Sequence, residues 1–468
     1  MEYITRIVDK EIKKKLSTMG AIEIKGPKWC GKTTSAMQVA KSKVEMQNPE
    51  KGKEYKELAL TKPSLLLEGE KPRLIDEWQI VPSLWNAVRY DVDKTSNRGQ
   101  YILTGSATPN DTDEEYLHSG VGRFAIINMK PFTLYESKDS NGKISLKDVF
   151  NKKANIDGIK SNITYERLAY LICRGGWPAS IDLPDDAALE IAKNYIDVLC
   201  ESDISKVDNR VRNPRLTRNI LRSYARQVST IDSDKSLYQD VIANYNEVTD
   251  RTIIDYIHVL ERLHIIEEIE AWNPNIRSKT AIRTAKKKSM VDPSLAVASL
   301  GASPRDIMLD VNTFGLLFEN LVDRDLSVYV NSIGGYAQHY RDRYGLECDC
   351  ILHLNDGRYG LIEAKLGGVE HIKEGEKHLL ELKKLINANK RMKEPEFLMV
   401  ITGFTDIAYT TNNGVMIVPL GCLKEWGCQL GRFWLTTLHI KTNKQWLLLN
   451  QTTLFTLTDN TLNRLSLI

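Results

Sequence analysis

Residues 26–34 constrain the fold more than any other stretch of the chain. They read Gly-Pro-Lys-Trp-Cys-Gly-Lys-Thr-Thr, the pattern of a phosphate-binding loop that ends in a lysine and a hydroxyl residue. Residues 21–25 alternate as in a short strand, and residues 35–43 contain no glycine or proline and predict a helix. In such a strand–loop–helix unit, backbone N–H groups and the helix N-terminus surround phosphates. The sequence therefore predicts a site for a nucleoside triphosphate.

The loop also assigns roles to single residues. Lys32 is expected to reach the β- and γ-phosphates of ATP, and the Thr33 hydroxyl to hold Mg²⁺. The alternative is a glycine-rich turn that merely resembles the motif, and the flanking strand and helix argue against it. The residues expected to bind the nucleotide are Gly26, Pro27, Lys28, Trp29, Cys30, Gly31, Lys32, Thr33 and Thr34.

An apolar strand is predicted to end in two acids, Asp76 and Glu77. A strand tip beside a phosphate loop is where an ATPase needs a partner for Mg²⁺ and a base for the attacking water. We expect Asp76 to take the first role and Glu77 the second. The alternative is a pair of surface acids at a strand end, which is a common arrangement.

Two further segments offer side chains to the same site. The next apolar strand ends near Thr104 and Ser106, and either hydroxyl is a candidate sensor of the γ-phosphate. Arg123 follows a glycine-rich turn, and it is predicted to neutralise transition-state charge in its own subunit or in a neighbour. The alternative for Arg123 is a surface arginine that caps a strand.

These motifs together resemble one family. The phosphate loop, Ile-Asp-Glu-x-Gln at 75–79, Leu-Thr-Gly-Ser at 103–106, the segment 129–136 and Gly-Gly-Trp-Pro at 175–178 look like prokaryotic AAA-type ATP-binding proteins with a C-terminal restriction-endonuclease-like domain. The resemblance extends to about residue 424. It implies an AAA-type ATPase domain, a winged helix and a nuclease-like module. It implies no physiological task, because the family is largely uncharacterised biochemically.

The N-terminus and the middle of the chain are predicted to be mainly helical. Residues 3–18 predict an amphipathic helix, and the Gly-Gly-Trp-Pro turn is expected to be structural, with Trp177 as its anchor. Relatives in the family often carry Arg-Asp-Ile where this chain has Ser202 before Asp203, which weakens a catalytic role for Asp203. A basic stripe on the helix from Pro214 tracks phosphates or faces solvent or a subunit; its members are Arg215, Arg218, Arg222 and Arg226.

A winged helix is expected from residue 236 onward, with Thr249 as the cap of its second helix. In DNA-binding winged helices the second helix enters the major groove and a basic wing contacts the backbone. Here the second helix also presents acids, which repel phosphates, so DNA contact and protein docking both stay open. The residues expected to face outward on that helix are Asp250, Arg251, Asp255, Tyr256, His258 and Glu261. The basic residues of the predicted wing are Arg277, Lys279, Arg283, Lys286, Lys287 and Lys288.

The C-terminal module carries the order of a restriction-type nuclease site. Asp349, a hairpin, and Glu363-x-Lys365 match the pattern in which two carboxylates bind Mg²⁺ and the lysine activates water beside a phosphodiester. By the family pattern, Glu319 completes the site from a helix. A second Mg²⁺ would bind here. The alternatives are a buried salt-bridge network without activity, or chance.

Composition sets outer limits on the function. The 468 residues suffice for about three domains, the net charge of +3 is nearly neutral, and the seven scattered cysteines form no disulfide framework or zinc motif. No signal peptide or membrane-spanning run is found, so a cytoplasmic protein without a membrane partner is expected. The expected domains are 1–136, AAA-type; 137–235, helical lid or linker; 236–310, winged helix; 311–425, restriction-endonuclease-like; and 426–468, an atypical extension.

The sequence thus predicts a multidomain α/β protein: a three-layer P-loop domain of AAA type, a helical segment with a winged helix, and a PD-(D/E)xK nuclease-like domain. Its expected function is Mg²⁺-dependent ATP binding and hydrolysis, coupled to the later modules and acting on double-stranded DNA. The alternative is an ATP-dependent switch or adaptor without nuclease activity, which binds a protein partner or a second copy of itself.

Overall fold

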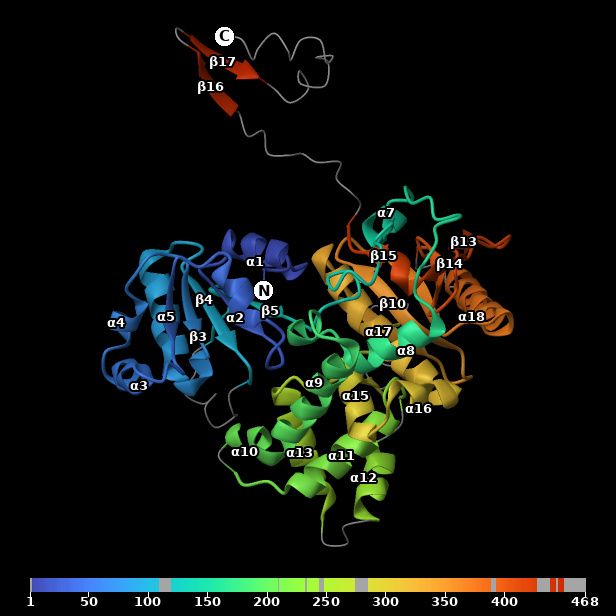
Figure 1. The fold of residues 1–468 in the computed structure, drawn as a ribbon, viewed down its shortest axis with the longest axis horizontal. Helices are drawn as coiled ribbons and strands as arrows, with labels where there is room; N and C mark the ends of the chain where they lie inside the picture. Colours follow the sequence, from blue (N-terminus) through green and yellow to red (C-terminus); the bar gives the residue numbers. More distant parts are fainter. Residues whose placement is uncertain are drawn as a thin grey trace. The chain divides into compact units, whose positions relative to one another are not determined.

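The computed structural model describes most of the chain and divides it into two compact units. Its described residues are 2–108, 119–208, 210–231, 234–243, 248–273, 285–388, 393–426, 438–442 and 445–449. The units are Met1–Glu425 and Trp426–Ile468. In the second unit, β16 (Leu438–Thr442) and β17 (Gln445–Leu449) pair antiparallel. The first unit contains every residue to which the sequence assigns a site role (Figure 1).

A five-stranded parallel sheet forms the N-terminal part, in the order β2-β3-β4-β1-β5 (Figure 1). Successive side chains of a strand point to opposite faces, so the inner strands β3, β4 and β1 bury residues on both sides. One face packs on α1 and α2, and the other on α3, α4 and α5, which gives the expected three layers. The strands are β1 (Ala21–Lys25), β2 (Ser42–Glu45), β3 (Arg73–Asp76), β4 (Tyr101–Gly105) and β5 (Phe124–Asn128). The helices are α1 (Val8–Leu16), α2 (Lys32–Met37), α3 (Gly52–Thr61), α4 (Pro63–Leu67), η1 (Trp78–Ile80) and α5 (Ser83–Thr95).

The first helix is shorter than the predicted span 3–18, because it begins at Val8. The residues before it are committed to tertiary contacts. The Tyr3 hydroxyl and the Arg6 N–H both donate to the carboxylate of Asp9. The N–H of Ile7 donates to Glu136 at 2.8 Å. These contacts hold the segment in a non-helical path against the end of the domain.

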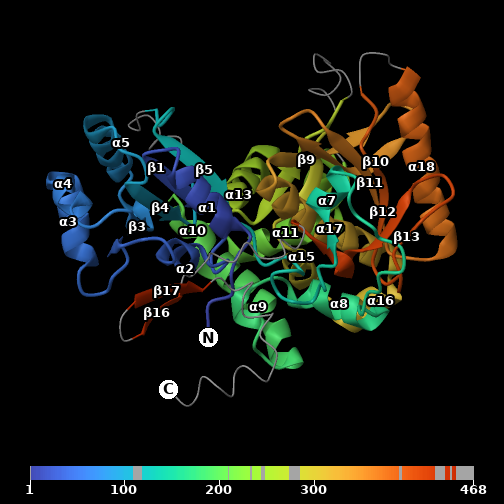
Figure 2. The same ribbon diagram turned by 90° about the horizontal axis from the view of Figure 1, so that it is seen from above.

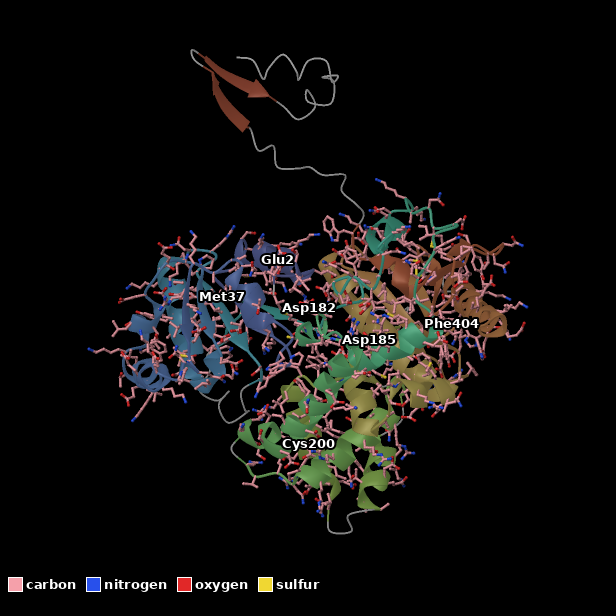
Figure 3. The ribbon with its side chains drawn as sticks, viewed as in Figure 1. Glu2, Met37, Asp182, Asp185, Cys200 and Phe404 are labelled. Carbon is pink, nitrogen blue, oxygen red and sulfur yellow. The ribbon has the colours of Figure 1, made fainter. Side chains whose placement is uncertain are left out.

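Helices dominate the middle of the first unit, where polar residues cap several of them. Thr249 caps α13 by accepting a hydrogen bond from the N–H of Thr252, as predicted. Figure 3 labels Asp185 and Cys200, which mark the first turn of α9 and the π-helical turn η3. The helices up to this point of the chain are α7 (Leu146–Phe150), α8 (Tyr165–Arg174), η2 (Pro178–Ser180), α9 (Asp185–Val198), η3 (Leu199–Asp203) and α10 (Ile204–Lys206). They are followed by α11 (Pro214–Arg226), α12 (Asp234–Ile242), α13 (Asp250–Arg262), α15 (Pro293–Leu300) and α16 (Pro304–Leu309). A hairpin of β7 (Ile266–Ile269) and β8 (Lys287–Met290) lies between α13 and α15.

A six-stranded mixed sheet follows, in the order β13-β14-β12-β11-β10-β9 (Figure 2). The long helix α17 (Val311–Ser332) packs on one face and α18 (Val369–Ala388) on the other, with buried side chains between each helix and the sheet. The strands are β9 (Gly335–Arg341), β10 (Glu347–Leu354), β11 (Tyr359–Lys365), β12 (Leu398–Thr402), β13 (Tyr409–Thr410) and β14 (Met416–Pro419). After the turn η4 (Leu420–Cys422), β15 (Leu423–Lys424) pairs with β6 (Ile144–Ser145), far earlier in the chain.

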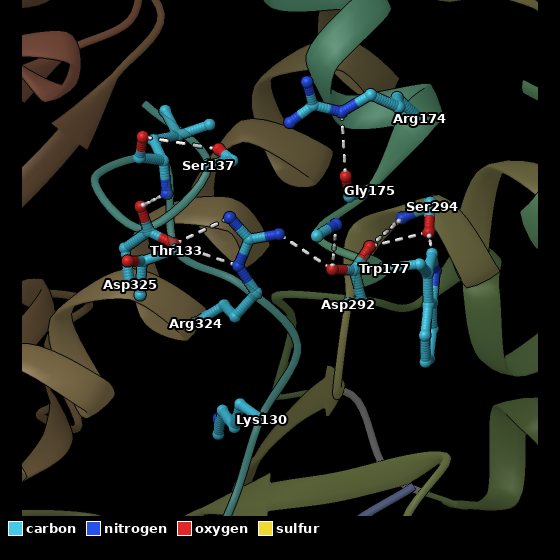
Figure 4. Close-up of polar contacts among 12 residues, drawn as sticks. Lys130, Thr133, Ser137, Arg174, Gly175, Trp177, Asp292, Ser294, Arg324 and Asp325 are labelled. Carbon is cyan, nitrogen blue, oxygen red and sulfur yellow. Dashed lines mark hydrogen bonds and ion pairs between the residues drawn. The ribbon is translucent and has the colours of Figure 1, made fainter. Parts of the chain in front are cut away.

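A buried ionic junction joins four segments of this unit (Figure 4). Arg324 of α17 is 1% exposed and forms ion pairs with Asp292 and Asp325, each at 2.7 Å. Asp325 accepts the N–H of Leu134, at the end of the parallel-sheet domain, at 2.9 Å. Asp292 accepts the N–H of Gly176 at 2.9 Å. The junction therefore fixes the Gly-Gly-Trp-Pro turn relative to both α17 and the nucleotide domain.

The same turn explains its two glycines and its tryptophan. Gly175 has φ +72°, and a Cβ on Gly176 would lie 2.1 Å from the carbonyl oxygen of Phe132. Trp177 is fully buried and donates its indole N–H to Ser294 at 2.9 Å (Figure 4). The prediction that Trp177 is a structural anchor is confirmed.

Candidate nucleotide site and carboxylate centre

The phosphate loop leaves β1 at Lys25 and enters α2 at Lys32, so the predicted strand–loop–helix order is present. The predicted helix 35–43 is wrong in extent, because α2 ends at Met37 and Ser42 and Lys43 belong to β2. Gly26 and Gly31 have positive φ angles of 152° and 98°. A Cβ on Gly26 would lie 2.2 Å from the carbonyl oxygen of Met129, so glycine is also required by packing. The Lys32 side chain folds over the loop, and its ammonium donates to the carbonyl oxygens of Gly26 and Pro27 at 2.8 and 2.7 Å.

Asp76 collects two hydroxyl groups at the tip of β3. Thr33 from α2 and Thr104 from β4 both donate to its Oδ1 atom, at 2.7 and 2.5 Å. Thr104 is opposite Asp76 because β3 and β4 are adjacent parallel strands in that register. Hydroxyl and carboxylate oxygens are ligands that suit Mg²⁺, so these residues fit the ion that the loop motif implies. Thr33 and Asp76 are the residues that would hold it.

Glu77, at the same strand tip, has a backbone conformation that residues other than glycine rarely adopt. Its φ of +55° is left-handed, which costs roughly 1–2 kcal/mol for a non-glycine residue. Its carboxylate accepts the Ser106 hydroxyl at 2.8 Å and a short hydrogen bond from the Gln79 amide. The two candidate sensors Thr104 and Ser106 therefore each contact one of the two acids.

Arg123 lies at the opposite edge of the sheet from the phosphate loop. It precedes β5, and its carbonyl oxygen accepts the N–H of Ala21, the first residue of β1. The loop follows the last residue of this five-residue strand, about 16 Å away at ~3.3 Å per residue. Arg123 instead pairs with Asp93 at 2.7 Å on the surface. Of the two roles that the sequence leaves open, this position argues against the one at the loop of its own subunit, and a role in a neighbour stays a prediction.

The helical middle contacts the loop through Lys28, which the sequence did not link to any acid. Its ammonium lies 2.8 Å from the Asp203 carboxylate in η3. Burial opposes ionisation of Asp203, but the ammonium groups of Lys28 and Lys206 hold its pKa below the usual value. A cavity of about 220 Å³ lies beside this pair. It is lined by Trp29, Ile191, Asn194, Tyr195 and Val198 together with the two ions. The only signal for Asp203 in the sequence was that the family this chain resembles often has an aspartate at this position.

Arg6 is a second residue that sequence reasoning missed. Its guanidinium donates to the carbonyl oxygens of Cys30 and Lys130, both at 2.8 Å, and pairs with Glu136 at 2.8 Å. The side chain is 4% exposed. Arg6 thus fastens the phosphate loop to the segment after β5.

His264, in the turn after α13, is a third residue that sequence reasoning missed. Its backbone is left-handed, with φ +57°. Burial, with the nearby positive charges of Lys32 and Lys25, lowers its pKa to about 4. The end of α13 is held to the nucleotide domain by hydrogen bonds between Arg262 and Thr108. A neutral imidazole from the helical middle is therefore carried close to the phosphate loop.

The four residues of the predicted nuclease site come together in the C-terminal module. Lys365 of β11 lies 2.9 Å from Glu363 and 3.9 Å from Asp349. Asp349 is held in place because its Oδ2 accepts the N–H of Ala364 at 2.8 Å. Glu319 reaches the same region from α17. Two residues that the sequence did not assign complete the group, and we call the whole set the carboxylate centre: Glu319, Asp323, Asp349, Glu363, Lys287 and Lys365.

Burial governs the acids of the carboxylate centre. It raises the pKa of Glu319 and Glu363, in each case reinforced by the charge of Asp349, and raises the pKa of Asp323 to about 6. Burial opposes the charge of Lys287, but Asp323, Glu319 and Asp349 keep its pKa well above the usual value. The lysine therefore stays charged while its carboxylate partners resist ionisation.

The predicted basic wing is wrong for the residues that the structure describes. Lys287 and Lys288 are buried, at 3% and 4% exposure. Lys286 pairs with Glu268 and Glu270, both at 3.1 Å. The hairpin is directed inward because its β7 side continues along the C-terminal sheet, where the N–H of Trp272 donates to the carbonyl oxygen of His339. The remaining wing residues, Arg277, Lys279 and Arg283, lie outside the described residues.

The other basic or outward-facing predictions are also modified. Tyr256 of α13 is buried at 6% exposure, so it does not face outward as predicted. Asp255 of the same helix pairs with Arg212 at 2.8 Å. On α11, Arg218 pairs with Asp197 at 2.6 Å and Arg226 with Asp240 at 2.9 Å. Two of the four arginines of the predicted stripe are therefore paired with acids.

Comparisons with known proteins identify the class of the domain that contains the phosphate loop. Residues 19–138 match a family model described as an AAA domain. The loop and its parallel sheet form an AAA-type ATP-binding domain. Residues 165–306, which span the helical middle and the hairpin, match a domain of unknown function (DUF8612). No curated protein matches the chain. Among the described residues, no helix is long and apolar enough to cross a bilayer.

Several solved structures are similar to the chain at low identity. The Walker-type ATPase paby2304 of Pyrococcus abyssi is 13% identical, with 62% of this chain and 94% of that chain covered and a TM-score of 0.38. AMPPCP-bound DnaA from Aquifex aeolicus is 12% identical, with coverages of 56% and 88% and a TM-score of 0.24. The Aeropyrum pernix ORC1 protein in complex with DNA is 14% identical, with coverages of 65% and 94% and a TM-score of 0.19.

Proposed function

We propose that the chain hydrolyses ATP at the phosphate loop with the help of Mg²⁺. The observation that supports this most is the convergence of Thr33 and Thr104 on Asp76, beside Lys32. Mg²⁺ would supply charge neutralisation at the β- and γ-phosphates. Lys32 would leave the carbonyl oxygens of the loop and donate to the same phosphates. These carbonyls are neutral, so the exchange removes no ion pair.

Glu77 is the proposed base. A base must be within hydrogen-bond reach of the attacking water and oriented toward it. The Ser106 hydroxyl and the Gln79 amide both donate to the Oε2 atom of Glu77 and fix its carboxylate, at a residue whose backbone is left-handed. Thr104 and Ser106 are then positioning residues for the two acids. A direct sensor role at the γ-phosphate is a finer proposal for either hydroxyl.

The contact between the phosphate loop and the helical middle supports coupling of the nucleotide state to the rest of the unit. Lys28 sits in the phosphate loop and pairs with Asp203 of the helical middle. A γ-phosphate bound to the loop would compete with Asp203 for this ammonium, because both are anions. Lys130, whose carbonyl Arg6 holds, forms a short ion pair with Glu267 of β7. We propose that these contacts carry the nucleotide state to the β7–β8 hairpin.

A second candidate function belongs to the carboxylate centre. The gathering of Glu319, Asp349, Glu363 and Lys365 favours a nuclease-like site of the PD-(D/E)xK type, with double-stranded DNA as substrate and a second Mg²⁺ as cofactor. The competing proposal is a switch or adaptor for a protein partner. It is favoured by the described lysines of the hairpin, Lys286, Lys287 and Lys288, which are buried or paired with acids and so offer little positive charge to a phosphate backbone. The winged-helix identity of residues 236–310 and the domain boundaries remain proposals.

The test is Mg²⁺-dependent phosphate release from ATP, with and without double-stranded DNA. Wild type is compared with Glu77→Gln, which should retain nucleotide binding and lose turnover. Glu268→Gln, an exposed acid far from the loop in sequence, is the control and should behave as wild type. Unchanged turnover in Glu77→Gln would remove Glu77 as the base. Turnover stimulated by DNA would support a nucleic-acid role, and turnover indifferent to DNA would support the adaptor.

A further inference from the structure

Lys287 occupies the middle of the carboxylate centre, although it comes from the hairpin and from a part of the sequence expected to contact DNA. Its ammonium lies 2.8 Å from Glu319, 2.7 Å from Asp323 and 2.8 Å from the carbonyl oxygen of Asp349. A lysine ammonium has three donors, and three oxygens surround this one. The side chain is 4% exposed. The ammonium therefore donates hydrogen bonds to Glu319 and to the carbonyl oxygen of Asp349, and it forms an ion pair with Asp323.

We propose that Lys287 is a built-in cation that takes the place of a divalent metal ion in this centre, and that the metal binds only when the lysine is withdrawn. This inference rests on the nuclease-like site proposed above. Mg²⁺ and Mn²⁺ prefer carboxylate and carbonyl oxygens, which are the groups that the ammonium now holds. The same oxygens cannot serve both cations at once.

The charge of the centre supports the exchange. Four carboxylates, Glu319, Asp323, Asp349 and Glu363, face two ammonium groups and the imidazole of His378, so negative charge is in excess when all four are ionised. Replacement of one ammonium by a divalent ion brings the centre closer to balance. Because buried uncompensated charge is costly, such a centre favours the ion with the higher charge once access is open.

Glu363 provides a second and independent observation. Its side chain is 1% exposed, and neither carboxyl oxygen accepts a hydrogen bond within the described residues. It faces Lys365 at 2.9 Å and His378 of α18 at 3.8 Å as ion-pair partners. Both of these cations face its Oε2 atom, so Oε1 is the buried oxygen left without a hydrogen bond, and a buried carboxylate oxygen normally accepts one. Glu363 lies next to Asp349 through their shared contact with Lys365.

The position of Lys287 on the β7–β8 hairpin explains how its ammonium can leave the carboxylate centre. Asp349 and Glu363 belong to the mixed sheet, whereas Lys287 belongs to the two-stranded β7–β8 hairpin. Withdrawal of the hairpin would move the lysine and leave the carboxylates in place. On β7, Glu267 is paired with Lys130 of the nucleotide domain. The hairpin thus contacts the carboxylate centre through Lys287 and the nucleotide domain through Glu267.

The inference is tested by Mn²⁺ binding to the full chain, without nucleotide, measured by electron paramagnetic resonance and calorimetry. Lys287→Met should bind one more Mn²⁺ than wild type, or bind it at least tenfold more tightly. Lys286→Met removes the same charge one residue earlier and is the matched control, so it should behave as wild type. Adding Asp349→Asn to Lys287→Met should abolish the gained site. Equal Mn²⁺ binding in wild type and in a folded Lys287→Met variant would overturn the inference.

A second measurement uses wild type alone, in case Lys287→Met does not fold. Acetylation of lysines by an amine-reactive ester is followed by mass spectrometry at increasing Mn²⁺. Lys287 should react far more slowly than Lys286, and saturating Mn²⁺ should raise its rate severalfold. A rate unchanged by Mn²⁺ would overturn the exchange. Mn²⁺ binding without DNA cleavage would leave this inference standing and remove the nuclease from the proposed function.

Discussion

The two charged sites of this protein hold their lysines in opposite ways. At the phosphate loop, the Lys32 ammonium contacts backbone carbonyl oxygens, which are neutral. At the carboxylate centre, Lys287 contacts two carboxylates and one carbonyl oxygen. An arriving phosphate therefore adds an ion pair at the loop, whereas an arriving metal must displace one at the centre. The first site is prepared for its ligand, and the second is already neutralised from within.

Burial sharpens this difference. Both lysines are largely inaccessible, with 5% exposure for Lys32 and 3% for Lys287. A buried charge whose partner is removed destabilises the fold strongly, whereas a cation held by dipoles can change partners at little cost. We therefore expect that loss of a charged partner at the carboxylate centre reduces the stability of the fold, whereas loss of Lys32 at the loop reduces ATP turnover. The predictions below test it in order of expected size.

The largest effect is expected for Lys32→Ala. Loss of the ammonium removes charge stabilisation at the phosphates, so ATP turnover should fall by roughly 100- to 1,000-fold. The thermal midpoint should change little, because only carbonyl contacts are lost. Lys365→Ala is the comparison at the other centre and should leave ATP turnover intact. Fluorescent-nucleotide binding and phosphate release check both variants, and a similar loss in both would break the contrast.

The second effect is on stability at the carboxylate centre. Asp323→Ala leaves Lys287 buried with one carboxylate fewer, and the free energy of unfolding should fall by about 3 kcal/mol. Urea unfolding followed by circular dichroism gives the value. Glu268→Ala breaks an exposed pair with Lys286 and should cost less than about 1 kcal/mol. If the two variants lose equal stability, the ammonium is not held as the contacts imply.

A third, smaller effect concerns the contact between the loop and the helical middle. Asp203→Asn removes the anion that competes with the γ-phosphate for Lys28, so ATP should bind more tightly, by up to about tenfold. Glu201→Gln, in the same helical turn but paired with Arg218, is the matched control. Nucleotide titration by calorimetry distinguishes the two variants. Weaker ATP binding in Asp203→Asn would show that the pair supports the site and does not compete with phosphate.

The smallest effect is a pH dependence from His264. Its pKa is about 4 in the folded chain, below the ordinary value near 6.5, so only the unfolded chain takes up a proton between these values. The unfolded state then binds more protons, and stability from this residue is full above pH 6.5 and is lost as pH falls toward 4. At pH 5.5 the loss should be about 1 kcal/mol. Urea unfolding at pH 7.5 and 5.5 should show a smaller drop in His264→Gln, and an equal drop would contradict the assignment.

Local spacing along the chain predicted the strand–loop–helix unit and the acidic strand tip of the nucleotide domain. The loop at 26–34 and the acids at the tip of β3 follow from short patterns, because a strand, a turn and a helix N-terminus are made by neighbours in sequence. The order of Asp349, Glu363 and Lys365 likewise indicated a cluster, since a hairpin brings its strands together. Arg123 was misplaced because its motif reveals a turn but not the edge of the sheet on which that turn lies.

The sequence by itself therefore determined which residues can carry the chemistry at each strand tip. Only the tertiary structure decided which charged side chains from distant parts of the chain accompany them. Arg6, Asp203 and Lys287 lie far along the chain from the groups they contact, and no local pattern encodes such pairs. Lys287 shows the reason most clearly. In sequence it belongs to a basic run that suggests an exposed surface, but the hairpin packs against the mixed sheet and buries its ammonium among carboxylates, where Coulomb attraction holds it.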